Sequence, residues 1–328
     1  MKNVLVTGAS GFVGTHLLEA LSGQGISTRA LYFSNPPPDA PLTNQSSIDW
    51  TRVDLLSDDL DRHLAGMDVV FHLAGYAGLA TDVATKLRLE RVNVLATERL
   101  AAAALRAGSK LVFTSSIHAC DGGPGQRIVD EEHGSPATEY GRSKMKAEEL
   151  LQTYGEQGLD FTVLRPTQLF GEYHEGSVLQ LVRAVRRGAF FLIGDGMNAT
   201  TFYYVKDFVD TLVRVAVNPI CRNRIYVDSD APLPLKSLVE EIAQNLDVPP
   251  PTFRIPRSLG MAIGATCDVV STALKVGLPL SVQRVRAMTR DVQYSNKRLL
   301  ADVGPGMRYG ICSGLGRTIA WYRVAGLI

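Results

Sequence analysis

The chain has 328 residues, of which 45% are hydrophobic and 20% charged, and 34 Lys and Arg against 33 Asp and Glu give a net charge of +1. This composition suits a globular protein with a full core and excludes disorder, and without a strong basic excess we expect no nucleic-acid partner. The four cysteines form no Cys-x-x-Cys pair and the six histidines show no ligand spacing, so we expect no disulfide framework and no metal site.

The first predicted strand, NVLVT at residues 3–7, leads into TGASGFVG, which places Gly8, Gly11 and Gly14 at three-residue intervals before a helix. Residues without side chains let a phosphate approach the backbone, and a helix N-terminus directs free N–H groups at an anion. In this strand-turn-helix context the glycines predict dinucleotide binding rather than a structural turn. The opening residues lack the long apolar core of a signal peptide, so we expect a cytoplasmic protein.

Short β-branched runs then alternate with helical segments, which predicts an α/β fold with a doubly wound parallel sheet. One helix is expected from Asp82 to Ala107, ending at Gly108. The apolar segment Leu259–Leu280 is interrupted by Asp268 and Lys275, which predicts a buried or amphipathic helix rather than a membrane span. Further strands are predicted at 27–33, 48–54, 68–74, 110–116 and 161–166.

Beyond residue 171 the alternation fades, so we divide the chain into two domains. The dinucleotide-binding domain is expected at 1–171 with a returning segment at 204–230. The smaller, mixed substrate-binding domain would comprise residues 172–203 and 231–328.

The stretch EYGRSKMKAEE, residues 139–149, should be helical, which puts Tyr140 and Lys144 side by side on one face. By itself this pattern fits either a solvated helix face or a pair of residues that moves a proton. We expect Arg142 and Lys146 to be solvated in either case.

Motifs along the whole chain resemble the extended short-chain dehydrogenase/reductase family, of the NAD-dependent epimerase/dehydratase type. The resemblance is closest to the branch of 3β-hydroxysteroid dehydrogenases and dihydroflavonol reductases. It implies a Rossmann fold and a catalytic role for the helix at residues 139–149. In chain order the motifs are the glycine pattern, HLAG (72–75), FTSS (113–116), Tyr140-x-x-x-Lys144 and RPTQLFG (165–171).

The resemblance makes Tyr140 the proton donor or acceptor and Ser116 the hydroxyl that hydrogen-bonds the reacting oxygen. A phenol with a pKa of about 10 needs a neighbouring cation to ionise near neutral pH, and Lys144 would supply that charge and hold the nicotinamide ribose. Ser115 is the rival of Ser116 for the same role, because adjacent strand residues point to opposite sides.

The resemblance also implies a set of cofactor contacts along the glycine loop and the ends of the strands. Asp54 would lie near the adenine or cap a helix, and Asn93 would give largely structural support. The full set is Gly8, Ser10, Gly11, Phe12, Val13, Gly14, Tyr32, Ser34, Asp54, Leu55, Leu73, Ala74, Gly75, Asn93, Tyr140, Lys144, Pro166 and Thr167.

The cofactor is expected to be NADP or NAD. Members that prefer NAD carry an acid at the end of the second strand, where this chain has Tyr32, Phe33 and Ser34. The missing carboxylate favours NADP, since nothing there repels a 2′-phosphate. The preference is only slight, because no arginine follows immediately to pair with that phosphate.

The substrate pattern points away from nucleotide sugars. Members acting on those often carry Arg-Asp where GDGMNATTFYYVKD has Thr200 and Thr201. We therefore expect an NAD(P)-dependent oxidoreductase acting at a secondary alcohol or ketone of an apolar or cyclic small molecule. The basic stretch RAVRRG, residues 183–188, reads as the last turn of a helix matched to its dipole rather than as a phosphate site.

Two alternatives stay open: a nucleotide-sugar epimerase, dehydratase or reductase with tightly bound NAD, and a non-catalytic dinucleotide-sensing protein. The intact Ser116, Tyr140 and Lys144 disfavour the second of these. By resemblance we also expect a homodimer in which the helix at 82–107 and the Tyr140 helix pair with their copies across a two-fold axis. The sequence leaves substrate identity and reaction direction open.

Overall fold

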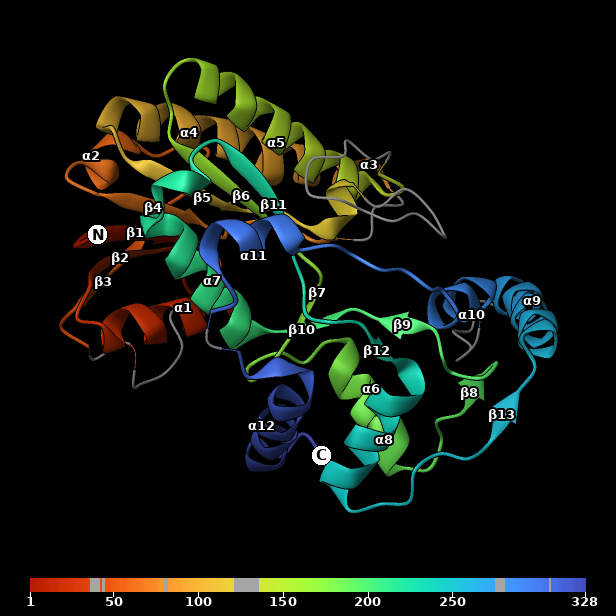
Figure 1. The fold of residues 1–328 in the computed structure, drawn as a ribbon. Coiled ribbons are helices and arrows are strands. Elements are labelled where there is room, and N and C mark those ends of the chain that lie inside the picture. The colour runs from red at the N-terminus through yellow and green to blue at the C-terminus, as the bar shows by residue number, and fades with distance from the viewer. Residues whose placement is uncertain (36–41, 43–44, 79–81, 121–135, 275–280, 307) are drawn as a thin grey trace.

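A seven-stranded parallel sheet in the order β11-β6-β5-β4-β1-β2-β3 forms the centre of the molecule (Figure 1). The computed structural model describes residues 1–35, 42, 45–78, 82–120, 136–274, 281–306 and 308–328. Each predicted strand range contains an observed strand, and the doubly wound fold is confirmed. The strands are β1 (Asn3–Thr7), β2 (Ser27–Tyr32), β3 (Ile48–Arg52), β4 (Val69–His72), β5 (Lys110–Thr114), β6 (Phe161–Pro166) and β11 (Arg224–Asp228).

Helices cover both faces of this sheet, with α2, α4 and α5 on one side and α1 and α7 on the other (Figure 1). Helices therefore separate both faces of the central strands from solvent, and β4 and β6 are buried at every position. The helices of this part are α1 (Phe12–Gly23), α2 (Asp61–Leu64), α3 (Val83–Leu89), α4 (Ala96–Ala107), α5 (Glu139–Glu156) and α7 (Val205–Val217).

The long helix predicted from residue 82 is confirmed, with one unforeseen feature. Asp82 caps it by accepting a hydrogen bond from Thr85 N at 2.8 Å, and Gly108 ends it with a φ of 68°. Between α3 and α4 lies a π-helical turn, η2 (Glu90–Leu95). This wider turn carries Asn93, and such turns often mark functional positions in helices.

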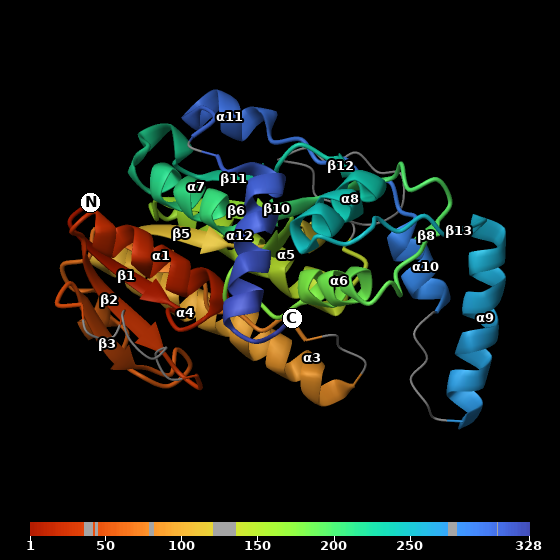
Figure 2. The same cartoon turned by 90° about the horizontal axis from the view of Figure 1, so that it is seen from below.

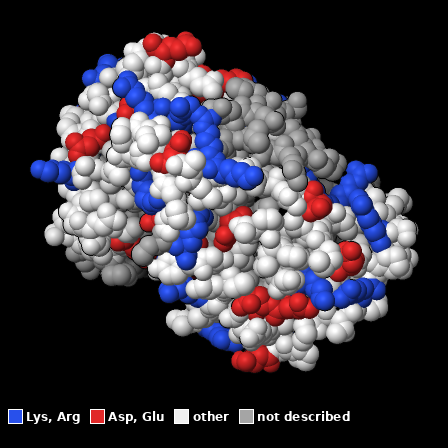
Figure 3. All heavy atoms as spheres, viewed as in Figure 1, with Lys and Arg blue, Asp and Glu red and all other residues white. Residues whose placement is uncertain are grey.

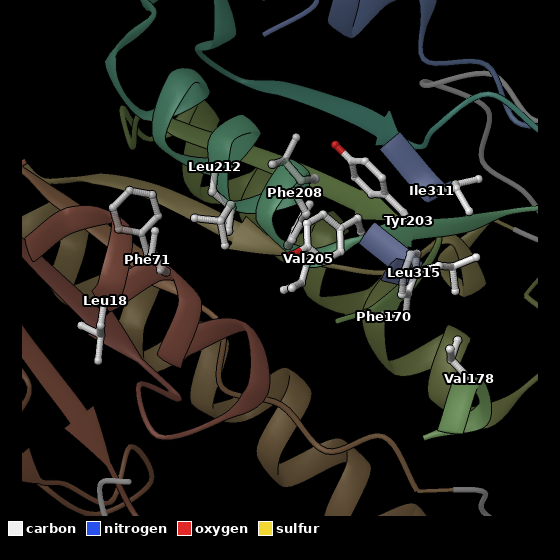
Figure 4. Close-up of a cluster of buried hydrophobic side chains, with 14 of the residues drawn as sticks. Leu18, Phe71, Phe170, Val178, Tyr203, Val205, Phe208, Leu212, Ile311 and Leu315 are labelled. Atoms are coloured by element: carbon white, nitrogen blue, oxygen red, sulfur yellow. The ribbon is translucent and has the colours of Figure 1, made fainter. Parts of the chain in front are cut away.

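A continuous apolar core joins the sheet to the rest of the chain on the α1 and α7 side. Figure 4 shows side chains of α1, β4 and α7 in one cluster with residues of the following elements. The labelled members include Leu18, Phe71, Phe208 and Ile311, and the first three are completely buried.

The remaining elements form a smaller group beside the carboxyl ends of the sheet strands (Figures 1 and 2). Three short strand pairs hold it together: β7 (Gln168–Phe170) with β10 (Phe202–Tyr204), β8 (Leu192–Ile193) with β13 (Arg254–Ile255), and β9 (Ala199–Thr200) with β12 (Leu233–Pro234). The helices of this group are α6 (Ser177–Arg186), α8 (Leu235–Leu246), α9 (Arg257–Leu274), α10 (Val282–Met288) and α12 (Gly310–Val324), whereas α11 (Lys297–Val303) packs against β11 of the large sheet (Figure 1). Short 3₁₀ helices are η3 (Ile117–Ala119) and η4 (Pro219–Cys221).

The apolar segment predicted at 259–280 is helical as α9 up to residue 274, and residues 275–280 lie outside the described part of the chain. Throughout the part of the chain that is described, no helix has the length and apolar character needed to cross a membrane.

Candidate active site

The glycines at the turn between β1 and α1 occupy positions with no room for a side chain. Gly8 has a φ of 65°, and a Cβ there would lie 2.7 Å from the backbone N of Ala74. A Cβ on Gly14 would lie 2.4 Å from Gly8 O. Gly11 caps α1 without a side-chain hydrogen bond, and the first turn contains no acid. The free N–H groups and the positive helix end therefore fit the diphosphate of a dinucleotide.

Neighbouring residues of the glycine loop are fixed by the protein itself. The hydroxyl of Ser10 donates to Asn35 O at 2.9 Å, which ties the loop to the segment after β2. The ring of Phe12 stacks on His174 with 4.5 Å between ring centroids, and Val13 packs against the core. Because the side chains of Phe12 and Val13 pack within the protein, only their backbone groups are available to a cofactor.

An arginine from β3 lies beside the end of β2, although none follows β2 in the sequence. Arg52, the last residue of β3, is the register partner of Tyr32, the last residue of β2. Its Nε donates to Phe33 O at 3.2 Å, and its guanidinium lies 5.8 Å from the centroid of the exposed Phe33 ring. The exposed Ser34 follows. The parallel pairing of β2 and β3 is the signal that could have revealed this cation.

Two carboxylates of the loop after β3 accept hydrogen bonds from backbone N–H groups of the same loop. Asp54 Oδ1 accepts from Leu56 N at 2.9 Å, and the carboxylate of Asp58 accepts from Asp54 N at 2.8 Å. Leu55 presents its carbonyl to Arg99 Nη1 at 2.5 Å. Asp54 thus stabilises the loop through the hydrogen bond that its Oδ1 accepts from Leu56 N.

A chain of hydrogen bonds fixes the ends of β1 and β4. Thr97 Oγ1 donates to Asn93 O at 2.7 Å, so it must accept from His72 Nε2, 2.9 Å away. The other ring nitrogen of His72 then accepts from Thr7 Oγ1 at 2.8 Å. Burial, together with the charge of Lys144, lowers the pKa of His72 to about 3, and the imidazole is neutral.

Asn93 joins the loop after β4 to the helix that carries Tyr140. Its Oδ1 accepts from Tyr76 N at 2.8 Å, while its Nδ2 donates to Tyr76 O and to Ser143 Oγ, both at 2.9 Å. Ser143 Oγ donates in turn to Tyr140 O at 2.8 Å. The amide of Asn93 is thus satisfied by protein atoms, in agreement with a supporting role.

Tyr140 lies in the first turn of α5, which is capped by Thr138 through a 3.0 Å hydrogen bond from Gly141 N. A Cβ on Gly141 would lie 2.1 Å from His118 O, so only glycine lets α5 approach η3 this closely. Ser116 caps the start of η3, where its Oγ accepts from His118 N at 3.3 Å. Burial raises the pKa of Tyr140, and a hydrogen bond with Ser116 opposes that rise.

Lys144 lies one turn further along α5 and is buried. Its Nζ donates to Thr114 O at 3.0 Å and stands 4.6 Å from the centroid of the Phe113 ring. Burial lowers its pKa to about 8, and the charge of Glu148 acts in the opposite direction. A Cβ on Gly75 would lie 3.2 Å from Nζ, so the loop of Leu73, Ala74 and Gly75 passes directly beside the lysine.

Ser115 hydrogen-bonds a different side chain from Ser116. Its hydroxyl donates to the carboxylate of Glu148, which also forms a buried ion pair with Arg165 at 2.6 Å. This pair connects α5 to the ends of β5 and β6, and it was not predicted from the sequence. Pro166 and Thr167 follow at the end of β6, where Thr167 N donates to Asp228 O at 3.1 Å.

The other charged residues considered in the sequence lie at the surface or bind backbone. Arg142 pairs with Glu139 and Lys146 with Glu90, both in exposed ion pairs. Arg183 Nε donates to Leu327 O at 3.0 Å, as a structural residue would. Within the described ranges, no group of three His, Cys, Asp or Glu residues could hold a metal ion.

A glycine loop after the first strand and a Ser-Tyr-Lys cluster at the carboxyl edge of a doubly wound sheet define a dinucleotide-dependent enzyme of the short-chain dehydrogenase/reductase class. Residues 4–227 match the NAD dependent epimerase/dehydratase family, and the chain belongs to that family.

Relatives of this family extend over nearly the whole chain. N-acetyl-alpha-D-glucosaminyl-diphospho-ditrans,octacis-undecaprenol 4-epimerase of Escherichia coli O157:H7 is 31% identical over 97% of this chain and 95% of its own length. The 2-alkyl-3-oxoalkanoate reductase of Stenotrophomonas maltophilia (strain K279a) is 27% identical over 81% of this chain and 82% of its own. The solved structure of MoeE5 in complex with UDP-glucuronic acid and NAD has a TM-score of 0.77 at 25% identity, covering 98% of this chain and 99% of that one.

These similarities favour the epimerase alternative over the expected oxidoreductase of an apolar substrate. The general expectation of an enzyme in this family is confirmed. NAD is the cofactor named with the MoeE5 structure, whereas the expected preference for NADP stays a prediction.

Proposed function

We propose that the enzyme inverts carbon 4 of a hexose carried on a diphosphate and retains a tightly bound NAD. The observation that carries the proposal is the placement of Tyr140 beside Ser116 at the end of β5, with the buried Lys144 one turn further along α5. Similarity to a 4-epimerase over 97% of the chain supports the choice of reaction.

The residues present fit NAD. Gly8, Gly11 and Gly14 leave the cradle for its diphosphate at the uncapped start of α1, and Lys144 would hold the nicotinamide ribose. When bound, NAD accepts a hydride from the sugar and later returns it.

Tyr140 would take the proton from the 4-hydroxyl of the sugar and give it back after the ring has turned. Ser116 would hydrogen-bond the same oxygen and hold it at the phenol. Burial alone disfavours the phenolate, so the tyrosine needs a nearby positive charge. With a pKa of about 8, Lys144 is protonated at pH 7 and can provide it.

Inversion requires the hydrogen on carbon 4 to leave one face of the ring and return to the other. The sugar must therefore turn while its carrier stays bound, and a diphosphate-linked carrier gives that anchor. A UDP-sugar and a polyprenyl diphosphate sugar share this chemistry. Thr200, at one of the two positions where nucleotide-sugar members often have Arg-Asp, donates its hydroxyl to Leu233 O at 2.7 Å.

The test offers purified enzyme three substrates: UDP-glucose, UDP-N-acetylglucosamine and polyprenyl diphosphate N-acetylglucosamine in detergent. We expect the 4-epimer of at least one, without net formation or consumption of reduced nicotinamide, and no epimer with Tyr140→Phe. The proposal fails if product appears only when NADPH is consumed in equal amount.

A ketoreductase is the second candidate, favoured by the Stenotrophomonas maltophilia relative. It would consume NADPH with an apolar ketone and release the oxidised cofactor after each turnover. NAD that copurifies and does not exchange excludes this candidate.

A further inference from the structure

The outward face of α9 is apolar from residue 259 to residue 270. Four of its aliphatic side chains are well exposed: Leu259 at 48%, Ile263 at 39%, Val269 at 70% and Val270 at 36%. From residue 259 to 270 the exposed positions are Leu259, Ala262, Ile263, Ala265, Thr266, Val269 and Val270.

The single polar residue of that face does not need water. The hydroxyl of Thr266 donates to Ala262 O within the helix at 3.1 Å. Every exposed side chain from Leu259 to Val270 can therefore leave water without losing a hydrogen bond.

The opposite side of α9 is built for close packing. A Cβ on Gly264 would lie 2.9 Å from the backbone at Ser281 and Val282, where α10 begins. Asp268, the only acid in α9, faces the same way and accepts from Val282 N at 3.0 Å. The helix is thus held by its small and acidic side. It lies at the edge of the molecule (Figure 2), and its aliphatic side is the exposed one.

Exposed basic residues lie on α9 and on its neighbouring elements. The elements β13, α9 and α10 together contain four arginines against the one inward-facing acid, in a chain whose net charge is only +1. All four, Arg254, Arg257, Arg284 and Arg286, are exposed. Figure 3 shows basic side chains next to uncharged surface at this end of the molecule. Phe253, 66% exposed, adds an aromatic ring just before β13.

We propose that α9 docks flat on an anionic lipid bilayer and brings the active site to a sugar carried on a polyprenyl diphosphate. An exposed aliphatic helix face, with exposed arginines on the side of α9 that packs on α10 and on the neighbouring elements, matches the two layers of such a surface, acyl chains below and phosphate headgroups above. A second copy of the chain fits less well, because an isologous contact would bring two positively charged ends of the molecule together.

This inference rests on the proposed function and extends it to one class of carrier. The E. coli relative is named for a substrate linked to undecaprenol, a membrane lipid. A docked helix holds the enzyme at the surface where such a diphosphate lies, without spanning the bilayer.

The test is flotation of the full-length protein with vesicles of phosphatidylethanolamine and phosphatidylglycerol, and with vesicles of phosphatidylcholine alone. We expect binding to the anionic vesicles, weakened by salt. Val269→Glu should lower the partition constant at least tenfold, because a carboxylate would enter the acyl region. Val217→Glu, a matched change at a 58% exposed valine that ends α7, should bind like the parent.

A second variant keeps the test independent of the apolar face. Arg257→Glu with Arg286→Glu should weaken binding to anionic vesicles and leave the melting temperature nearly unchanged. No flotation of the parent protein overturns the inference, as does equal flotation of the Val269→Glu variant. Loss of self-association in that variant, without any vesicle binding, would assign the face to a second copy instead.

Activity separates this inference from the proposed function. Val269→Glu should retain bound NAD and turn over detergent-solubilised lipid-linked sugar normally, but lose at least tenfold in rate when the same sugar is embedded in vesicles. Vesicle binding by an enzyme that epimerises no carrier would refute the function and leave the docking surface in place.

Discussion

Replacing Lys144 by methionine should make the protein more stable at pH 7 while it abolishes turnover. The pKa of Lys144 falls from 10.5 to about 8 because its ammonium is buried, a difference of about 3 kcal/mol in the cost of the charge. Methionine fills similar space without that cost, but it loses the hydrogen bond to Thr114 O, which contributes about 1 kcal/mol. The net gain should be about 2 kcal/mol, or roughly 3 °C in melting temperature for a chain of 328 residues.

The gain should depend on pH in a defined direction. Between pH 8 and 10.5 the unfolded chain holds a proton on Lys144 that the folded protein has lost, so the parent gains stability as the pH rises through this window. Below about pH 8 both states hold the proton and the full cost of burial applies. The advantage of the methionine variant is therefore largest at neutral pH and shrinks toward pH 10.5.

Thermal unfolding of nucleotide-free protein at pH 7 and pH 9.5 measures this effect. The control is Lys146→Met on the same helix, where the lysine is 52% exposed and pairs with Glu90 at 3.0 Å. That surface pair contributes little, and the control should stay within about 0.5 kcal/mol of the parent. A Lys144→Met variant that is less stable than the parent at pH 7, or a difference that does not change with pH, refutes the reasoning.

Three further outcomes are expected. Tyr140→Phe should lower turnover by about 10² or more and leave dinucleotide affinity within twofold, as isothermal titration and rate measurements would show; near-parent activity removes Tyr140 from its role. Arg52→Gln should weaken NADP binding about tenfold and leave NAD binding unchanged, because the guanidinium beside Phe33 O can pair with the 2′-phosphate that NAD lacks; equal NADP titration curves for parent and variant would exclude Arg52. Sedimentation should give twice the monomer mass of 35.6 kDa, since Val83 and Leu87 are 74% and 60% exposed on α3, and a mass of 35.6 kDa sinks the dimer.

Local patterns were enough to predict most of the fold and the outline of the site. Strand runs such as NVLVT are continuous and apolar because both sheet faces are covered, so their positions can be read directly. The glycine loop and the caps of the long helix at Asp82 and Gly108 are likewise local signals. Each depends on residues within a few positions of one another.

What could not be predicted depends on contacts between distant segments. Arg52 approaches Phe33 only because β2 and β3 pair in one register, and nothing near either residue fixes that pairing. The burial of Glu148 with Arg165 likewise requires α5 and β6 to be in place, since an acid in a charged helix normally looks solvated. The roles of Ser115 and Ser116 differ for the same reason: what each meets lies on another element.

The hydrogen-bond chain through His72 gives the enzyme a natural spectroscopic reporter. The ring is completely buried and its Nε2 proton is held by Thr97, so that proton can exchange with solvent only when β4 and α4 separate. Its pKa of about 3 keeps the resonance unchanged across the pH range in which ordinary histidines titrate. With only six histidines in the chain, this one signal can follow the integrity of the Rossmann layer in solution.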